Sequence, residues 1–358
     1  MSGNAREIEK IVVRLPNWVG DAVMATAALR SIRLGYPDAQ IYLYGKAKLL
    51  DLLGGLDGCD VTIPLGPGSG RVWSEAAALK PHRFDLGLLL PNSFSSALVF
   101  FLGGVKRRTG YGLNGRSFLL NRRIPISARA RKKNPQPMTA YYLNIARFAG
   151  GAETGEDLEL AVDPEGDSRA GAFLQERGLG DARPLIGLNA GSSFGPSKCW
   201  TPEGFARLSD AIHDELGGRT LLLCGPGEEE IARQIVDRAR RPIIDTSREV
   251  LPFSVLKSVM KRLQLLVTTD TGPRHIAVAF GIPVVVLMGP TNPAYTASNL
   301  DRTRVVRVDL ECAPCHKKEC DREHACMREI TAEEVLARAR ELLSPQPAAA
   351  IGQGERHG

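Results

Sequence analysis

Short apolar runs alternate along the chain with segments whose apolar residues recur every three to four positions. The runs are typical of strands buried on both faces, and the periodic segments are typical of amphipathic helices. In the first half we expect strands at 11–15, 40–44, 61–65 and 85–90, and helices at 21–34, 46–53, 94–102 and 141–148. In the second half we expect strands at 185–189, 220–224, 265–269 and 283–288, and helices at 202–216, 228–238 and 272–280. This alternation predicts an α/β protein with doubly wound parallel sheets.

The segment 150–167, rich in Gly, Glu and Asp, is the predicted linker between two domains. We expect an N-terminal domain over residues 1–165 and a C-terminal domain over residues 166–343. The low-complexity residues 344–358 are expected to be disordered. A length of 358 residues agrees with two domains.

The composition, 43% hydrophobic and 24% charged, is that of a soluble globular protein and excludes a disordered, collagen-like or coiled-coil chain. No apolar run approaches the roughly 20 residues of a membrane span. The longest candidate, residues 96–105, is short and runs into Lys106, Arg107 and Arg108. The N-terminus has no apolar signal core, so we expect a cytoplasmic location.

The distribution of charge is uneven, because no acidic residue occurs between Asp85 and Glu153. This acid-free stretch, residues 86–152, carries eleven Lys and Arg side chains, whereas the whole chain has a net charge of +6, so the remainder is at −5. A one-sided positive field attracts an anionic partner. Few aromatic residues accompany the basic ones, which argues against single-stranded nucleic acid. An acidic membrane surface or an acidic glycolipid is the favoured partner, and a solvated face without a partner is the alternative.

Ligands of parallel sheets bind beyond the carboxyl ends of the strands, so the residues after each strand are the candidates for chemistry. The strand at 265–269 leads into a turn that opens a helix, where free N–H groups and the helix dipole suit a phosphate. The turn contains Asp270, Thr271, Gly272, Arg274 and His275. Its arginine and histidine can add positive charge. An ordinary Asp or Thr N-cap with a core-facing histidine explains the same residues.

Two neighbouring strand ends favour the phosphate interpretation. A small polar loop with Ser192 and Ser193 follows one strand, and Lys198 comes next as a cation available to a phosphate. A Gly-rich turn with Glu228 follows another strand, and this carboxylate can accept a hydrogen bond from a ribose hydroxyl. Together the three strand ends predict a nucleoside-diphosphate site. The chain has no GxxxxGK[ST] loop, which excludes a P-loop NTPase.

In the first half, Asp21 is the candidate for chemistry, because it follows the first strand and the loop 16–20. As a general base it would face the cleft between the halves. As an N-cap it would stabilise the following helix by about 1 kcal/mol. From the residues alone, the N-cap is the favoured interpretation.

Four segments together resemble glycosyltransferase family 9, the heptosyltransferases. They are LPNWVGDAVM at 15–24, FGPSKCW at 194–200, DTGPRH at 270–275 with GPT at 289–291, and the late Cys-rich segment. The resemblance spans roughly residues 9–342 with the motifs in order. It implies the GT-B fold, in which two Rossmann-like domains face each other across a cleft.

The implied reaction is inverting transfer of a heptose from ADP-L-glycero-β-D-manno-heptose to the first heptose of the lipopolysaccharide inner core, heptosyl-Kdo2-lipid A. Another family 9 transferase, acting with the first or third heptose or a different sugar, is one alternative. A non-catalytic sugar-nucleotide-binding protein of the same fold is another. The family generally works without a bound metal. The resemblance also implies peripheral association with the cytoplasmic face of the inner membrane of a Gram-negative-type bacterium. It implies no nucleic-acid partner.

The resemblance also implies roles for individual residues. Asp21 matches the catalytic base that takes the proton from the acceptor hydroxyl. The donor-binding residues would be Ser192, Ser193, Lys198, Glu228, Asp270, Thr271, Gly272 and His275. The acceptor-binding residues would be Asn17, Trp18, Arg107, Arg108, Arg122 and Arg123.

Four cysteines, Cys312, Cys315, Cys320 and Cys326, have a spacing compatible with a structural zinc ion. A second CxxC pair is absent from the segment. In a reducing cytosol, free thiols in a packed loop are the favoured interpretation, zinc is the second and disulfides are the third.

Overall fold

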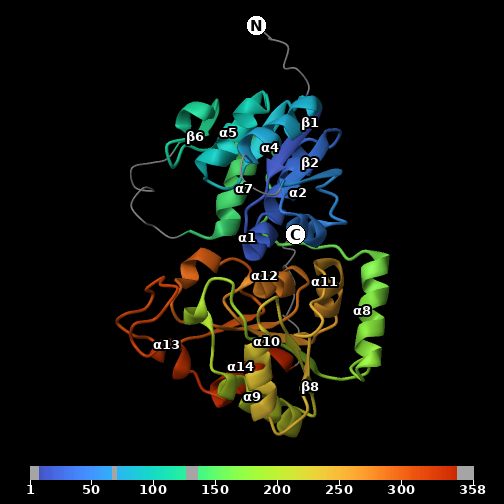
Figure 1. Cartoon of the computed structure of the whole chain (residues 1–358), viewed down its shortest axis with the longest axis vertical. Helices are drawn as coiled ribbons and strands as arrows, with labels where there is room; N and C mark the ends of the chain where they lie inside the picture. The colour runs from blue at the N-terminus through green and yellow to red at the C-terminus, as the bar shows by residue number, and fades with distance from the viewer. Residues whose placement is uncertain (1–7, 67–70, 126–135, 345–358) are drawn as a thin grey trace, which may run out of the picture.

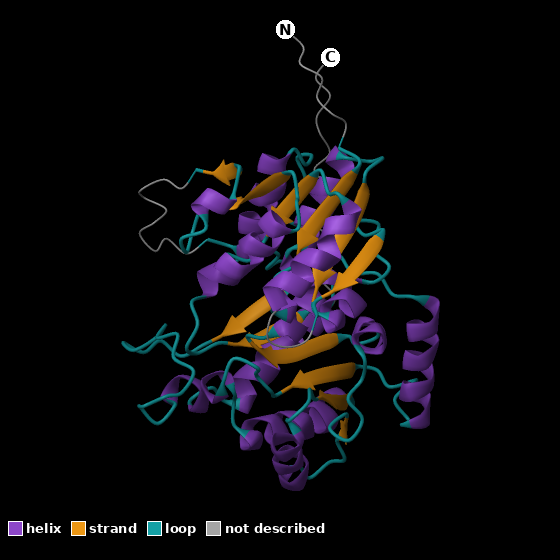
Figure 2. Cartoon of the chain, turned by 45° about the horizontal axis from the view of Figure 1, so that its top comes forward, coloured by secondary structure: helices purple, strands orange, loops and turns teal. Residues whose placement is uncertain are grey.

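The computed structural model describes residues 8–66, 71–125 and 136–344. They form two α/β halves, each built on a six-stranded parallel sheet with helices on both faces (Figures 1 and 2). No helix among these residues is long and apolar enough to span a bilayer. The predicted tail lies outside the described residues from position 345 onward, as do four of the eleven basic residues of the acid-free stretch, within 126–135.

The first sheet has the strand order β3-β2-β1-β4-β5-β6. Its strands are β1 (Lys10–Arg14), β2 (Gln40–Gly45), β3 (Val61–Pro64), β4 (Leu86–Leu89), β5 (Arg107–Tyr111) and β6 (Arg122–Ile124). The helices of this half are α1 (Val19–Met24), α2 (Thr26–Gly35), α3 (Ala47–Leu53), α4 (Arg71–Leu79), α5 (Phe94–Leu102) and α7 (Met138–Ala149), with the 3-10 turn η2 (Ser117–Leu119).

The second sheet has the order β12-β11-β10-β7-β8-β9. Its strands are β7 (Leu185–Asn189), β8 (Arg219–Leu223), β9 (Ile244–Asp245), β10 (Leu265–Thr269), β11 (Val284–Leu287) and β12 (Thr303–Val306). The helices of this half are α8 (Pro164–Glu176), α9 (Pro202–Leu216), α10 (Glu229–Arg238), α11 (Phe253–Lys261), α12 (Gly272–Ala279), α13 (Ala325–Arg328) and α14 (Ala332–Leu343), with the 3-10 turns η3 (Pro196–Lys198) and η4 (Pro293–Thr296).

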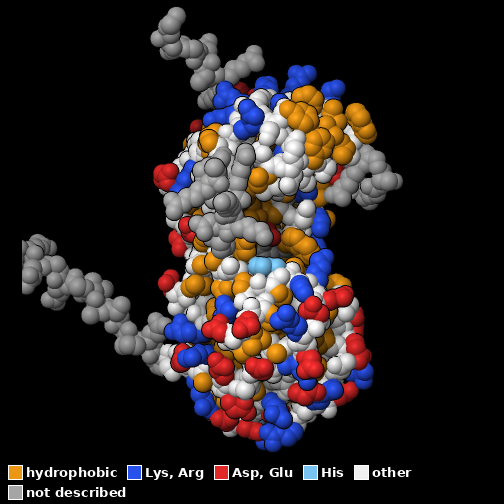
Figure 3. All heavy atoms as spheres, turned by 90° about the vertical axis from the view of Figure 1, so that its left-hand side faces the viewer, with side chains coloured by type: hydrophobic (Ala, Val, Ile, Leu, Met, Phe, Trp, Pro, Cys, Tyr) orange, Lys and Arg blue, Asp and Glu red, His pale blue; other side chains and the backbone are white. Residues whose placement is uncertain are grey.

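The two sheets share one topology. Numbered within its own half, each sheet has the strand order 3-2-1-4-5-6. The direction of winding changes between β1 and β4 in the first sheet and between β7 and β10 in the second. Such a switch point leaves a crevice at the carboxyl ends of the strands, where ligands bind. The surface is hollowed between the halves (Figure 3).

The core explains why these segments form central strands. Every residue of β4, β7, β10 and β11 is buried, as expected for strands covered by helices on both faces. One apolar cluster includes Ala22 and Val23 of α1 together with Ile276 and Ala277 of α12. The two halves therefore pack against each other through apolar side chains.

The predicted helix at 21–34 is instead two helices, α1 and α2, with a break at Ala25. The Thr26 hydroxyl donates a hydrogen bond of 2.7 Å to the Val23 carbonyl, a bond that competes with the helical backbone pattern. The end of the predicted linker is also helical, because α8 begins at Pro164. Asp163 caps it by accepting a hydrogen bond of 2.7 Å from the Gly166 amide.

Candidate active site between the two halves

The amino-terminal ends of α1 and α12, one from each half, meet at the boundary between the halves (Figure 1). Each has a glycine at the contact. A methyl group on Gly20 would lie 2.7 Å from Cδ2 of His275, and one on Gly272 would lie 2.7 Å from Cβ of Val19. Side-chain carbons do not approach so closely, so this packing requires glycine at both positions. The contact places groups that follow β1 next to groups that follow β10.

Asp21 lies in the first turn of α1 and is half-buried. Its Oδ1 accepts a hydrogen bond of 2.9 Å from the hydroxyl of Tyr142 on α7. Burial raises the pKa of Asp21, while the Tyr142 bond and the nearby Lys198 act in the opposite direction. Burial and the carboxylate raise the pKa of Tyr142 well above its ordinary value, so its hydroxyl keeps its proton. The N-cap interpretation of Asp21 is wrong, because Trp18 occupies the N-cap position.

Asp270, after β10, is the centre of a buried ionic cluster. Lys198 Nζ lies 3.0 Å from Oδ2, and Arg274 Nη1 lies 3.0 Å from Oδ1. The Thr291 hydroxyl donates a hydrogen bond of 2.8 Å to Oδ2. Burial opposes the charge on Asp270, but the two cations and the hydrogen bonds outweigh it and lower its pKa to about 2. Lys198 is therefore paired rather than free, and the cluster keeps one net positive charge from its two cations and one carboxylate.

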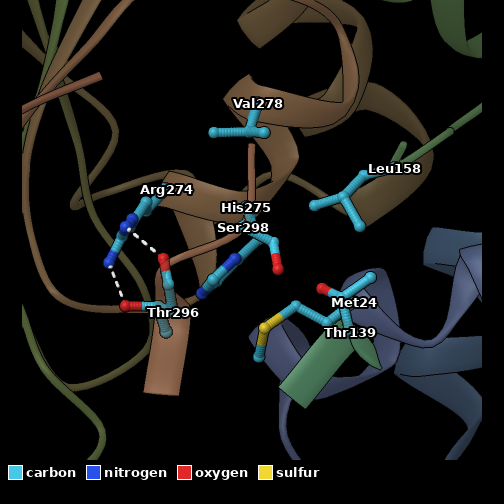
Figure 4. Close-up of a pocket in the computed structure, with 8 residues that line it drawn as sticks. All are labelled: Met24, Thr139, Leu158, Arg274, His275, Val278, Thr296 and Ser298. Carbon is cyan, nitrogen blue, oxygen red and sulfur yellow. Dashed lines mark hydrogen bonds between the residues drawn. The ribbon is translucent and has the colours of Figure 1, made fainter. Parts of the chain in front are cut away.

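Of the two residues after Pro273, Arg274 keeps the positive charge expected from the sequence and His275 does not. Arg274 donates hydrogen bonds of 2.7 and 3.0 Å to the hydroxyl and carbonyl of Thr296, so its guanidinium anchors η4. Burial, together with the charge of Arg274, lowers the pKa of His275 to about 3. The expected positive charge on His275 is therefore wrong, because its imidazole is neutral near pH 7. Its ring lies between Thr296 and Met24 of the N-terminal half, beside a cavity of about 10 Å³ that is too small for a ligand (Figure 4).

Thr271 is the N-cap of α12, but its side chain accepts no hydrogen bond from the helix. Its hydroxyl instead accepts one of 3.2 Å from the Asn189 amide, which ties the end of β7 to the end of β10. The N–H groups of the first turn of α12 thus have no side-chain cap, and they carry the positive end of the helix dipole. This helix start can accept a phosphate, as the sequence predicts.

A pocket of about 610 Å³ opens in the C-terminal half beside these strand ends. Its lining brings together three predicted donor residues, Ser192, Ser193 and Glu228. The Glu228 Oε2 accepts a hydrogen bond of 2.7 Å from the Gly225 amide. A methyl group on Gly191 would overlap this carboxylate, so the acid lies directly against the backbone of the polar loop. Burial raises the pKa of Glu228. The size and polarity of the pocket suit a nucleoside.

The Cys-rich segment supports the loop that carries Lys198. Ser197 donates a hydrogen bond of 2.6 Å from its hydroxyl to the Lys317 carbonyl and one of 3.1 Å from its amide to the Lys318 carbonyl. His324 contacts the Ser197 carbonyl and also lines the 610 Å³ pocket. The segment therefore forms one wall of the predicted donor site, which the cysteine spacing alone did not indicate.

The four cysteines of this segment are unpaired thiols in the structure. Cys326 is buried, Cys312 is half-buried, and Cys315 and Cys320 are exposed. Across the described ranges, no three His, Cys, Asp or Glu side chains are arranged to hold a metal ion. Free thiols and a structural zinc ion both stay predictions, and metal analysis of freshly purified protein separates them.

Asn17 and Trp18 lie on the loop between β1 and α1, at the same sheet edge as Asp21. Asn17 Oδ1 accepts a hydrogen bond of 3.0 Å from Arg14, and the Trp18 side chain is 57% exposed. An exposed indole beside the candidate base suits contact with an acceptor sugar.

A polar network at the ends of β4 and β5 escaped the sequence analysis. The buried guanidinium of Arg116 donates to the Tyr111 carbonyl at 3.0 Å and to the Asn92 side chain at 2.8 Å. Asn92 in turn donates to the Tyr141 hydroxyl at 2.7 Å. Burial lowers the pKa of Arg116 to about 10, so it stays charged at pH 7. This network rigidifies the sheet edge next to Tyr142 and Asp21.

The four predicted acceptor arginines do not lie together at the cleft. Arg107 pairs in register with Leu86 at the amino end of β5, roughly 13 Å along the strand from its carboxyl end. Arg108 donates hydrogen bonds of 2.7 and 2.6 Å to the Leu119 and Val105 carbonyls. The remaining two are Arg122, which contacts the Phe148 carbonyl at 3.3 Å, and Arg123, which is exposed beside it.

Comparisons with known proteins agree with this architecture. The profile of "Glycosyltransferase family 9 (heptosyltransferase)" matches residues 72–326. Lipopolysaccharide heptosyltransferase 2 of Escherichia coli K12 is 29% identical, with 95% of this chain and 100% of that protein covered. Lipooligosaccharide heptosyltransferase 2 of Haemophilus influenzae is 27% identical, with 93% and 99% covered.

Solved structures give the same result for the fold. The structure of E. coli ADP-heptose LPS heptosyltransferase II superposes with a TM-score of 0.79 at 27% identity, covering 93% of this chain and 98% of that one. A glycosyltransferase family 9 structure from Veillonella parvula superposes with a TM-score of 0.81 at 23% identity, covering 95% and 99%. The predicted GT-B fold is confirmed.

Proposed function

This chain belongs to glycosyltransferase family 9, and from that membership we propose that it transfers a heptose from ADP-L-glycero-β-D-manno-heptose to the first heptose of the lipopolysaccharide inner core. The relatives reported above, which match over nearly their whole length, are named heptosyltransferase 2. The observation that carries the proposal is the meeting of α1 and α12, which sets a carboxylate of one half beside an anion-binding helix start of the other.

Asp21 acts as the general base. The acceptor hydroxyl oxygen attacks the anomeric carbon of the donor, its proton passes to Asp21, and the bond between that carbon and the phosphate oxygen breaks with inversion. A raised pKa brings the carboxylate closer to the working pH, which suits proton abstraction. Tyr142 holds the carboxylate in place.

The donor diphosphate lies at the start of α12. The uncapped N–H groups and the net positive cluster of Lys198, Asp270 and Arg274 stabilise the negative charge that develops on departing ADP. The adenosine occupies the 610 Å³ pocket, where Glu228 accepts a hydrogen bond from the ribose. These groups replace a divalent cation, so transfer should persist in EDTA.

The acceptor is borne by a lipid, which places the enzyme at the cytoplasmic face of the inner membrane. Asn17 and Trp18 flank the base and contact the acceptor sugar. A family 9 activity with the first or third heptose differs from this proposal in the acceptor, and one with a different sugar differs in the donor. Incubation with ADP-heptose and a series of heptose-deficient acceptors, followed by mass measurement of the products, separates the first, second and third transfers.

The decisive variant is Asp21→Asn, matched with Asp38→Asn, an exposed aspartate remote from the cleft. We expect Asp21→Asn to reduce kcat by about a thousandfold, the usual contribution of a general base, while ADP-heptose affinity changes less than about twofold. Calorimetric titration and a product assay measure the two quantities. Near-normal turnover of Asp21→Asn would refute the proposed mechanism, and tight ADP binding with no transfer by the wild type would favour a non-catalytic binding protein.

A further inference from the structure

An exposed aromatic stripe runs along the outer face of α5. Phe94 and Phe101 are 42% and 49% exposed, and their spacing of seven residues places both on one face of the helix, with Leu98 between them. Phe118 of η2 is 73% exposed, and its ring centroid lies 6.0 Å from that of Phe94. An apolar patch is visible on the N-terminal half (Figure 3). Large exposed apolar patches on a folded protein mark interaction surfaces.

Positive charge surrounds this stripe. All three phenylalanines lie in the acid-free stretch 86–152. The Arg108 guanidinium lies 5.3 Å from the centroid of the Phe101 ring. Arg123 is exposed on β6. Lys106, in the loop before β5, is 49% exposed but pairs with Asp85 at 2.7 Å, so its charge is compensated. Arg108, at the amino end of β5 and away from the cleft, thus lies on the side of the domain that carries the stripe.

We propose that this docking face, formed by Phe94, Phe101 and Phe118 with Arg108 and Arg123, binds the surface of an anionic lipid bilayer. Aromatic side chains enter the boundary between head groups and acyl chains, and basic side chains attract the lipid phosphates. The inference rests on the proposed function for its biological purpose, because a lipid-borne acceptor requires the cleft to approach a membrane.

The charge distribution favours a bilayer over a second copy of the chain. A two-fold interface would bring the docking face of one copy against the same face of another. Arg108 and Arg123 of one copy would then oppose the same arginines of the other, which is unfavourable. An anionic bilayer supplies both the opposite charge and an apolar interior.

The position of the stripe also suits access to the cleft. Phe94 opens the helix that follows β4, and Phe118 lies on the loop after β5, so both are at the carboxyl edge of the sheet. Asp21 follows β1 at the same edge. A bilayer against the docking face would therefore adjoin the side of the N-terminal half from which the acceptor must enter.

The test is co-sedimentation of the full chain with vesicles that contain no lipopolysaccharide. We expect binding to phosphatidylcholine vesicles with about 30 mol% phosphatidylglycerol, weak binding to pure phosphatidylcholine, and loss of binding in about 0.5 M NaCl. The double variant Phe101→Ser/Phe118→Ser should bind the anionic vesicles about tenfold more weakly. Arg123→Gln should lose part of the preference for anionic lipid.

The matched control is Val250→Ser/Leu300→Ser, which removes two apolar side chains of 43% and 38% exposure from the C-terminal half. It should bind vesicles like the wild type. Transfer to a delipidated acceptor sugar should be unchanged in the phenylalanine variant. This activity shows that the variant folds, and it tests the proposed function independently of vesicle binding. The proposal would be overturned if the phenylalanine variant bound vesicles as strongly as the wild type. It would also be overturned if the wild type bound no vesicles but formed a dimer that the phenylalanine variant could not form.

Discussion

The two halves share a strand order but use their switch points for opposite electrostatic purposes. At the edge of the first sheet, Asp21 is held by the neutral hydroxyl of Tyr142, and burial raises its pKa. At the edge of the second, Asp270 is held between Lys198 and Arg274, which overcome burial and lower its pKa to about 2. The first carboxylate is therefore the stronger base, whereas the second stays ionised.

This difference shows that the topology provides the crevice and the partners of each carboxylate decide its chemistry. A neutral partner leaves a half-buried acid basic enough for proton transfer. Two cationic partners turn the same residue type into a structural anion that positions positive charge for a diphosphate. The contrast can be tested by changing one side at a time.

The largest effect after that of Asp21 is expected on the donor side, for Lys198→Ala. Loss of this ammonium leaves Asp270 with one cation and removes the net positive charge, so kcat/KM should fall about 100- to 1,000-fold. In contrast to Asp21→Asn, the affinity for ADP should fall as well, and calorimetry measures it. Lys198→Arg keeps the charge and is the control. Unchanged ADP affinity in Lys198→Ala would remove the proposed distinction between the two halves.

The next effect tests the contact that joins the halves. Gly20→Ala and Gly272→Ala would each place a methyl group 2.7 Å from the other half, so the two helix starts must move apart. We expect kcat/KM to fall about a hundredfold, because catalytic groups are displaced by a fraction of an ångström or more. Gly171→Ala on α8, where the nearest atom is 3.9 Å away, is the control. Near-normal rates in both cleft variants would show that catalysis does not need this approach.

The elements that sequence periodicity predicts well are those with a plain apolar run or a capping residue. β7, β10, α5 and α9 have the predicted boundaries. Ser93 and Thr201 cap the last two helices with their side chains, which explains why their starts are sharp. β5 was missed because its first two residues, in RRTGY, are arginines and its apolar content is low.

Some residues of the candidate site can likewise be predicted from the sequence and others cannot. The strand-end rule locates Lys198, Glu228 and Asp270, because parallel topology gathers the carboxyl ends of the strands. It cannot find Tyr142, which is 121 positions from Asp21 and meets it only because α7 packs against α1. The sequence also does not predict the pairing of Lys198 with Asp270 or the neutral state of His275, because both depend on burial in the packed cleft.

A smaller effect is expected from Tyr142→Phe on the acceptor side. The Tyr142 hydrogen bond lowers the pKa of Asp21, so its loss should raise that pKa further. The base must be deprotonated to act, and the acidic limb of the pH–rate profile should therefore shift to higher pH, with kcat about tenfold lower at pH 7. The KM for ADP-heptose should not change.

Tyr141→Phe is the matched control for Tyr142→Phe, because the neighbouring hydroxyl accepts a hydrogen bond from Asn92 and does not contact Asp21. It should keep the wild-type pH profile. An unshifted acidic limb in Tyr142→Phe would mean that the bond does not tune the base.

The smallest effect is expected for Glu228→Gln, which tests the nucleoside end of the donor side. The amide keeps the shape and can still accept the Gly225 bond, but a charged acceptor becomes a neutral one. A ribose hydroxyl bound to a carboxylate gains about 1 kcal/mol over a neutral acceptor, so ADP affinity should fall about fivefold. Pyrophosphate carries no ribose and should bind both forms equally.

Burial raises the pKa of Glu228, so wild-type ADP affinity should weaken as the pH falls through that pKa, whereas Glu228→Gln should show no such loss. An equal loss of pyrophosphate affinity would place Glu228 in the support of the phosphate cluster instead of the ribose site.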